Sequence, residues 1–407
     1  MAGVADKARF HLERAVPQLR EFEEKEIFSK EEIRTIVQKR TEYEHLVLGP
    51  GCKPHHFQSY IAWELSLEKL RSKRCIRKKI KHSTSHASNA RVFNIYERAV
   101  FRHPGSLALW KEYLDYAARV KATKRWRKIM TRALRLHPLD AELWTRAGRR
   151  AATDGDMEGA RGMFMRGCRF CNTTVDLWIE YARVEMEWLA KLERKKGGKK
   201  GLAGARAEEA VDEGDVLRFD EDDEEEDEFG DDDEILPDPL VEEQNKKAKE
   251  AKKVFTEEAV NKLAKSPALE GAIPRAIFDI ARKQSFFGAP AGEAFFDVFA
   301  SFTSVSAQAT LIQHVLDVLV EGWPKHPATG GCLIRQPLVG VDVTTVEFPR
   351  ALREVLARIN THIATTDNKP KLAAKTTAWI ERMIKDDELD ENIRTVLEHT
   401  KAKLESP

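Results

Sequence analysis

Residues 109–114 read LWKEYL, residues 143–148 read LWTRAG and residues 177–182 read LWIEYA. The tryptophans of these stretches, Trp110, Trp144 and Trp178, are spaced 34 residues apart, although Trp makes up only 8 of the 407 residues. Further columns follow the same spacing, among them Leu109, Leu143 and Leu177 and the larger side chains Tyr96, Met130 and Phe164. A fixed period of about 20–50 residues indicates stacked supersecondary units, so the chain is predicted to be a repeat protein.

Each unit is predicted to hold two antiparallel helices. In the first helix Trp110, Tyr113, Leu114 and Ala117 recur at helical spacing, and in the second Ile129, Met130 and Ala133 do the same. The aromatic side chain of one helix is expected to fill the space left by a small residue of the other. A single pair cannot bury both apolar faces, so neighbouring pairs are expected to stack.

The repeat type resembles the HAT (half-a-TPR) repeat rather than the tetratricopeptide repeat. HAT units carry Trp, an aromatic three residues later and an acid seven residues later. Two first helices fit this pattern, one of them with Phe in place of Trp: Trp178, Tyr181 and Glu185, and Phe57, Tyr60 and Glu64. The tetratricopeptide pattern requires a glycine in the first helix, and among the three tryptophan repeats only one has glycine at that position, Gly148. The predicted repeat core is Phe57, Trp110, Trp144, Trp178, Tyr96, Met130 and Phe164.

The fold class expected from this resemblance is all-α, a right-handed helical-hairpin solenoid of HAT repeats that a disordered acidic insert interrupts. The expected organisation is N-terminal helices in 1–50, HAT repeats 1–3 and the first helix of repeat 4 in 51–194, a charged and largely disordered insert in 195–270, and HAT-like repeats in 271–407. In the first part, one helix is expected at about 6–25 and another from the capping box at Ser29 and Glu32 to about Leu48. The β-branched stretch 333–348 is expected to be an extended connection.

Charge is strongly segregated along the chain, although Lys plus Arg is 68 and Asp plus Glu is 67. Residues 1–206 carry a net charge of +19, residues 207–234 carry −17, and residues 235–407 carry −1. The basic half favours a polyanion or an acidic partner. The acidic block contains nine consecutive acids at 220–228, repels itself and is predicted to be disordered.

Several classes of protein are not expected. The first residues lack the apolar run of a signal peptide, no stretch has the roughly 18–20 apolar residues of a membrane span, and five cysteines cannot make a disulfide scaffold. The chain is therefore predicted to be soluble and intracellular, without a membrane partner. Cys168 and Cys171 have the spacing of a zinc pair but lie on a repeat helix without a second pair, so no metal site is predicted. No nucleophile elbow or paired-carboxylate constellation stands out in the sequence, so no catalytic site, cofactor or small-molecule substrate is predicted either.

Two sets of residues are predicted to contact partners. The positions one and five after each repeat tryptophan share a face beside the buried stripe, and by analogy with tetratricopeptide arrays this face lines a groove. The groove residues are Lys111, Asp115, Arg149 and Arg183, together with Thr145 and Ile179. The second set lies in an extra basic loop within 72–89 and contains Lys73, Arg74, Arg77, Lys78, Lys79 and Lys81. This loop is either a solvated connection, or a nuclear-localisation or RNA-backbone contact.

The N-terminal 48 residues carry the most specific resemblance. They read AVPQL at 15–19, IFSKEEI at 27–33 and KRTEYEH at 39–45, followed by Lys53-Pro54 and the Phe57 repeat. This region resembles the HAT-repeat subunits of the UTP-B subcomplex of the small-subunit processome, which are U-three small nucleolar RNA-associated proteins. The resemblance implies a nucleolar scaffold for pre-rRNA processing and 18S rRNA maturation. Its implied partners are the β-propeller subunits of UTP-B, with snoRNA and pre-rRNA nearby.

Two other functions remain open from the residues themselves. HAT scaffolds of splicing or of messenger-RNA 3′ processing have similar repeats. A protein that binds RNA directly and without regard to sequence would show affinity in residues 1–206 alone, with a steep dependence on salt.

Overall fold

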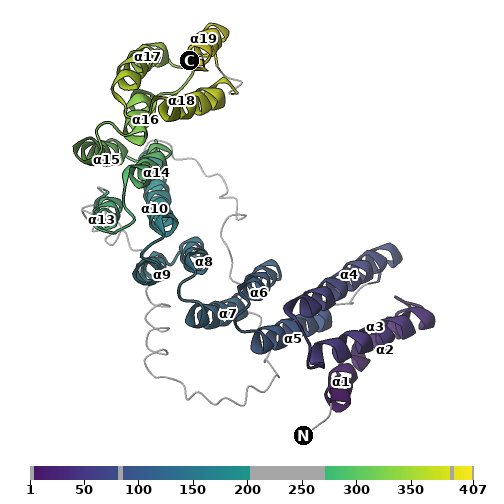
Figure 1. The fold of residues 1–407 in the computed structure, drawn as a ribbon. Coiled ribbons are helices and arrows are strands. Elements are labelled where there is room, and N and C mark those ends of the chain that lie inside the picture. Colours follow the sequence, from purple (N-terminus) through teal and green to yellow (C-terminus); the bar gives the residue numbers. More distant parts are fainter. Residues whose placement is uncertain (1–3, 81–85, 202–270, 386–388, 406–407) are drawn as a thin grey trace. The chain divides into compact units, whose positions relative to one another are not determined.

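The structure is a computed structural model that describes residues 4–80, 86–201, 271–385 and 389–405. Within these ranges every regular element is a helix (Figure 1), which confirms the predicted all-α class. No helix in the described ranges has both the length and the apolar character needed to cross a bilayer. The chain divides into two compact units, residues 1–171 and 172–407, and each unit is described by itself.

Unit 1 begins with three helices and continues as helical hairpins. Its helices are α1 (Val4–Glu13), α2 (Val16–Glu24), α3 (Lys30–Leu48), α4 (Pro54–Lys78), α5 (His86–Arg102), α6 (Leu107–Arg119), α7 (Thr123–Leu136), α8 (Ala141–Thr153) and α9 (Met157–Phe170). The hairpins are α4–α5, α6–α7 and α8–α9, in which consecutive helices pack against each other. The first helix of each hairpin carries Phe57, Trp110 or Trp144, as predicted; Trp110 and Trp144 are 34 residues apart, whereas Phe57 lies 53 residues before Trp110.

The N-terminal helices follow local signals in the sequence. Ser29 accepts a hydrogen bond from the Glu32 backbone N–H at 3.2 Å, and the Glu32 carboxylate accepts one from the Ser29 N–H at 2.9 Å. The predicted capping box and the helix to Leu48 are therefore confirmed. The single helix expected at 6–25 is wrong, because the chain breaks after Glu13 and α2 restarts with Pro17 in its first turn. Proline lacks an N–H and suits the first turn of a new helix.

Two hydrogen bonds explain why tryptophan and proline recur together. The indole Nε1 of Trp110 donates to the Pro104 carbonyl at 2.9 Å, and that of Trp144 donates to the Pro138 carbonyl at 2.8 Å. Each bond joins a first helix to the loop that precedes it, so a buried indole N–H finds an acceptor. At the third position Asn172 replaces proline, and Trp178 Nε1 has no hydrogen-bond partner among the described residues.

Small residues let the paired helices of unit 1 approach closely. A Cβ atom added to Gly148 on α8 would lie only 2.4–2.7 Å from the Phe164 ring of α9. Phe164 is fully buried. The expectation that an aromatic ring fills the space beside a small residue is therefore confirmed at this pair.

Unit 2 contains further hairpins with a different composition. Its helices are α10 (Val175–Gly201), α13 (Ala272–Ala281), α14 (Ala289–Ala300), α15 (Gln308–Gly322), α16 (Pro327–Arg335), α17 (Glu347–Thr365), α18 (Lys369–Ile384) and α19 (Glu391–Glu405), with a 3₁₀ turn η3 (Gln336–Leu338) after α16. Helix α14 pairs with α15, α16 with α17, and α18 with α19. Helix α10 packs against α13 and α14.

Two expectations for unit 2 are corrected by the structure. The stretch 333–348 is not one extended connection: α16 and η3 continue to Leu338, and α17 already begins at Glu347. Ile334 is fully buried, so tertiary packing outweighs the weak helix propensity of the β-branched residues. Helix α10 also continues to Gly201, so the first seven residues of the predicted insert are helical although three of them are glycine. Residues 202–270, with the acidic block, lie outside the described residues.

Candidate functional site: charged faces of the helical hairpins

The first candidate site is the predicted groove face of the first helices. In unit 1 this face is crossed by ion pairs between α6 and α8. Lys111 Nζ lies 3.5 Å from Asp140 and also contacts Glu142, and Asp115 accepts a hydrogen bond from Arg146 at 2.7 Å. A further hydrogen bond joins Gln58 of α4 to Glu112 of α6 at 2.5 Å. The groove charges of α6 therefore tie neighbouring first helices together.

The other groove residues lie on α8 and on α10. Arg149 is exposed on α8 and Thr145 is half-buried one turn earlier. Arg183 lies in unit 2, where its guanidinium is 3.3 Å from Glu180 of the same helix, and Ile179 is half-buried. The structure thus brings together Lys111 and Asp115 with acidic and basic residues of α8, whereas Arg183 belongs to the other unit.

The second candidate site is the basic segment after Arg71, and its expected loop conformation is wrong. Helix α4 continues through Lys73, Arg74 and Arg77 to Lys78, and Lys79 caps it in a left-handed conformation with a φ of 54°. The physical reason is tertiary: Cys75 is buried in a cluster with Phe22 and Phe28. Lys81 lies outside the described residues.

Of the five basic residues of this segment that the structure describes, two have side-chain contacts with other helices or turns. Arg74 makes a bidentate pair with Glu32, with both distances 2.7 Å, and its guanidinium lies 4.7 Å from the Phe28 ring centroid. The hydrogen bonds from Arg74 and the Ser29 N–H lower the pKa of the Glu32 carboxyl to about 2. Lys78 donates to the Glu26 carbonyl. Arg74 and Lys78 therefore fasten the end of α4 to the turn between α2 and α3.

The other basic residues of this segment are exposed. Lys73, Arg77 and Lys79 face solvent, together with Ile76, whose relative exposure is 75%. No described residue forms an ion pair with Lys73, Arg77 or Lys79. These three cations are available to a negatively charged partner.

Helix α7 presents a second basic face. Its fourteen residues contain six Lys or Arg and no acid. Three of the six are occupied: Arg125 lies 4.5 Å from the Phe93 ring centroid, Arg127 pairs with Asp154 at 3.5 Å, and Arg132 pairs with Glu97 and lies over Trp110. Lys124, Lys128 and Arg135 are exposed, and no described residue forms an ion pair with them. Their spacing of four and seven residues places these three cations on one stripe.

A buried polar network lies among α2, α3, α4 and α5, and the sequence analysis did not find it. Arg40 and Glu64 are almost fully buried and form a bidentate pair at 2.8 and 3.0 Å. Glu44 accepts two hydrogen bonds from Arg98, at 2.7 and 3.0 Å. The pKa of the Glu44 carboxyl is lowered, because the hydrogen bonds and charge of Arg98 outweigh the raising effect of burial.

Neutral groups complete this network. Arg40 Nη2 donates to Gln18 at 3.0 Å, and Gln18 in turn donates to Ser88 at 2.8 Å. The Tyr60 hydroxyl donates to Glu44 at 3.0 Å. The signal in the sequence was a pair of charges, Arg40 and Glu44, at positions where the buried stripe of α3 requires apolar residues.

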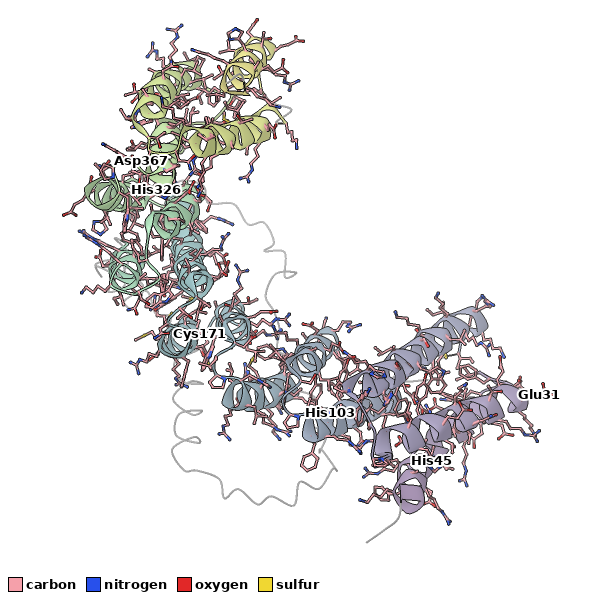
Figure 2. All side chains as sticks on the ribbon, viewed as in Figure 1. Glu31, His45, His103, Cys171, His326 and Asp367 are labelled. Carbon is pink, nitrogen blue, oxygen red and sulfur yellow. The ribbon has the colours of Figure 1, made fainter. Side chains whose placement is uncertain are left out.

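The cysteine pair has the environment of core side chains. Cys168 and Cys171 are buried, and Figure 2 labels Cys171 at the end of α9. Burial raises the pKa of the Cys168 thiol to about 12, whereas a metal ligand needs the thiolate. Cys171 Sγ lies 3.6 Å from the Pro138 carbonyl. In the described ranges no group of three His, Cys, Asp or Glu side chains is arranged to hold a metal ion.

These observations define the class of protein: an all-helical array of hairpins whose exposed features are charged helix faces. Residues 12–98 match the family model described as U3 small nucleolar RNA-associated protein 6. The resemblance predicted from the N-terminal sequence is therefore confirmed in this region.

Relatives extend the similarity to nearly half of the chain. The U3 small nucleolar RNA-associated protein 6 of Schizosaccharomyces pombe is 32% identical over 193 residues, which cover 46% of this chain and 40% of the relative. The human homolog is 25% identical over 197 residues, and the mouse homolog is 26% identical over 199 residues. Each of these two alignments covers 47% of this chain and 33% of the relative. The match thus spans well under two thirds of the length of these relatives.

Proposed function

We propose that this chain is a non-enzymatic scaffold of the small-subunit processome. The observation that carries the proposal is the match of residues 12–98 to the U3 small nucleolar RNA-associated protein 6 family, with relatives of the same name over about 193–199 residues. The chain would belong to the UTP-B subcomplex in the nucleolus. It would act in pre-rRNA processing and in maturation of the 18S rRNA.

The proposed mechanism is protein–protein docking on a HAT solenoid. The hairpins α4–α5, α6–α7 and α8–α9 would be HAT repeats 1–3, and α10 would open repeat 4. The predicted partners are the β-propeller subunits of UTP-B, within a particle that also holds snoRNA and pre-rRNA. Support comes from the Trp–Pro grid and from the exposed charges beside the ladder that joins α6 and α8.

Affinity purification of the tagged full chain from nuclear extract tests this function. We expect β-propeller proteins and U3 snoRNA to co-purify at stoichiometric levels in moderate salt. Recovery of spliceosomal or 3′-processing proteins instead would contradict the assignment and favour the alternative HAT scaffolds. The variant Arg149→Glu, Arg183→Glu should remain folded and weaken recovery if the groove face is used. Normal recovery by this variant would move the interface away from these two residues.

Direct, sequence-blind RNA binding is a second candidate function. Its support is the stripe of Lys124, Lys128 and Arg135 on α7 and the exposed cations at the end of α4. Removing one cation that neutralises a phosphate should reduce the slope of log K against log salt by about 1, so Lys128→Ala should do so if Lys128 touches a phosphate. An exposed lysine such as Lys371→Ala on α18 is the matched control. An unchanged slope for Lys128→Ala would remove that residue from the RNA interface.

A further inference from the structure

The second helices of the unit 1 hairpins end in large apolar side chains that are exposed to solvent. Phe101 near the end of α5 is 82% exposed, and Leu136 and Phe170, the last residues of α7 and α9, are 52% and 51% exposed. Leu139, in the loop after α7, is 75% exposed. Single exposed apolar residues are ordinary, but four at the ends of consecutive hairpins indicate an interaction surface.

Contacts between the hairpins hold these helix ends along one edge of unit 1. The ring nitrogen Nε2 of His137, directly after α7, lies 2.8 Å from the carbonyl oxygen of Pro104 in the loop after α5. The thiol of Cys171, directly after α9, donates to the carbonyl of Pro138 in the loop after α7 at 3.6 Å. Figure 2 labels His103 and Cys171, the residues that directly follow α5 and α9. The ends of α5, α7 and α9 therefore form one continuous edge.

Arginines accompany the apolar side chains along this edge. The last two residues of the three helices are Phe101-Arg102, Arg135-Leu136 and Arg169-Phe170. Arg102 donates to backbone carbonyls after α3, whereas Arg135 and Arg169 are exposed and no described residue forms an ion pair with either. A cation suits the C-terminal end of any helix, so the arginines alone would not indicate a site. The exposed apolar side chain beside each of them does.

The edge carries an excess of positive charge. Helix α7 contains no acid, and Glu158 of α9 lies in the first turn, at the opposite end of that helix. Glu97 of α5 is paired with Arg132. Asp140, in the loop after α7, lies 3.5 Å from Lys111 Nζ and is occupied in the same way. Electrostatic complementarity therefore favours an acidic partner at this edge.

The apolar side chains favour a polypeptide over single-stranded RNA. Bases stack on aromatic rings, but Leu136 and Leu139 have no ring, and the Phe170 ring is stacked on Trp144 with centroids 5.9 Å apart. A second copy of the same edge is also disfavoured, because it would bring arginines of like charge together. A polypeptide that combines carboxylates with large apolar side chains matches both features of the edge.

We propose that the edge formed by the ends of α5, α7 and α9 binds an acidic segment of a partner polypeptide that has large apolar side chains between its carboxylates. The carboxylates pair with Arg135 and Arg169. The apolar side chains cover Leu136, Leu139 and the exposed part of Phe170. This edge is separate from the groove face of the first helices, and the proposal does not depend on the ribosomal assignment.

The test uses the full chain in methyl NMR titrations at constant ionic strength. The probe is the peptide acetyl-Glu-Leu-Asp-Phe-Glu-amide, and its matched controls are acetyl-Gln-Leu-Asn-Phe-Gln-amide and acetyl-Glu-Ser-Asp-Ser-Glu-amide. We expect the probe to shift the methyl signals of Leu136 and Leu139 and to bind at least about tenfold more tightly than either control, because each control lacks one of the two kinds of contact. Equal binding of either control, or no binding of the probe, would overturn the proposal.

RNA is tested in parallel, because Arg135 also belongs to the basic stripe of α7. A uridine pentanucleotide that shifts the methyl signals of Leu136 and Leu139, while the acidic peptide does not, would overturn the proposal and assign the edge to RNA.

A double variant locates the site on the edge. Leu139→Ser, Arg169→Gln changes two exposed side chains, so it should remain folded and reduce affinity for the acidic peptide at least about tenfold. Val346→Ser is the control, because Val346 is 82% exposed at the start of α17 in unit 2. Thermal unfolding checks that both variants are folded. Affinity that survives the double variant, or that is lost equally in Val346→Ser, would contradict the proposed location.

Discussion

The hairpins of unit 1 and unit 2 share a pairing pattern, but among the described hairpins it is α6–α7 and α8–α9 of unit 1 in which a first-helix indole bonds to the proline carbonyl of the preceding loop. In unit 1, directional bonds join the helices and loops, such as Trp144 Nε1 to the Pro138 carbonyl at 2.8 Å and Arg40 to Glu64 at 2.8 Å. In unit 2, the α14–α15 hairpin is filled by apolar side chains, among them Phe295, Phe299 and Leu319, which are fully buried.

The difference explains where the repeat is visible in the sequence. A hydrogen bond from an indole to a proline carbonyl needs these two residue types at this spacing, so the 34-residue grid stands out in unit 1. Burial of apolar surface is non-directional, and Phe, Leu, Ile and Val can replace one another if the total volume is kept. Unit 2 therefore keeps the hairpin pattern without keeping a residue signature.

The largest expected effect is the loss of Trp144. Trp144→Ala should lower the free energy of unfolding of unit 1 by about 3–5 kcal/mol, because it removes a buried aromatic side chain. Trp144→Phe keeps an aromatic ring but removes the indole donor to the Pro138 carbonyl, and should cost about 1–3 kcal/mol. In unit 2, the volume-conserving change Leu316→Met should cost less than about 1.5 kcal/mol.

Hydrogen exchange in increasing urea measures these variants for each unit separately. The amides of α8 and α9 report on unit 1, and those of α14 and α15 report on unit 2. If Trp144→Phe cost no more than Leu316→Met, the distinction between directional and non-directional packing would fail.

A comparable effect is expected for the buried ion pair. Arg40→Met leaves the Glu64 carboxylate buried without its partner and should cost about 3–5 kcal/mol. The double variant Arg40→Met, Glu64→Leu removes both charges and should be clearly more stable than the single variant. A double-mutant cycle read by urea unfolding of unit 1 gives the coupling, and a coupling near zero would mean that the two side chains do not depend on each other.

A smaller difference in stability is expected between alanine substitutions at two helix glycines, Gly148 and Gly292. In unit 1 the added Cβ of Gly148→Ala would meet the rigid Phe164 ring at 2.4 Å, so this change should destabilise by about 1–3 kcal/mol. In unit 2 the Cβ of Gly292→Ala would meet a terminal methyl of Leu319 at 2.6 Å, which can rotate away. The cost of Gly292→Ala should therefore be partly offset by the helix propensity of Ala, and should remain within about 1 kcal/mol. Thermal unfolding of both variants checks the order, and a reversed order would contradict it.

The smallest expected effect is the loss of folding stability at acidic pH. Burial, followed by the nearby Arg98, lowers the pKa of His11 on α1 despite the opposing charge of Glu44. The folded state then binds this proton less readily than the unfolded chain, whose histidine has a pKa of about 6.5. The contribution of His11 to stability is therefore fully present above about pH 6.5, and it is lost as the pH falls through the lowered pKa of the folded state.

Matched histidine variants assign this pH dependence to each unit. His11→Gln should flatten the loss of stability of unit 1 between about pH 7 and 5. Burial and Arg358 lower the pKa of His362 on α17, so His362→Gln should flatten the corresponding slope of unit 2 alone. Urea unfolding at several pH values provides the measurement. Slopes unchanged in both variants would assign the acid sensitivity to other groups.

The sequence predicted the repeat tryptophans and their hairpins, but it did not predict which residues of neighbouring helices the groove residues contact. Lys111 was expected to face a partner, and the structure shows it paired with Glu142 on the next first helix. Periodicity identifies which side of a helix a residue occupies, whereas the neighbour that covers it depends on how hairpins stack. The basic segment after Arg71 was expected to be a loop for the same reason, because its contacts with Glu32 and Glu26 come from residues more than forty positions away.

The sequence alone determined the all-α class, the 34-residue period, the capping box at Ser29 and the resemblance of the N-terminal region, since each depends on residues close together or evenly spaced. Tertiary structure decided the continuation of α4 to Lys78, the helical start of 333–348 and the buried network around Arg40. Burial of a charged side chain is favourable only when its partners arrive from other helices, and no local pattern contains that information.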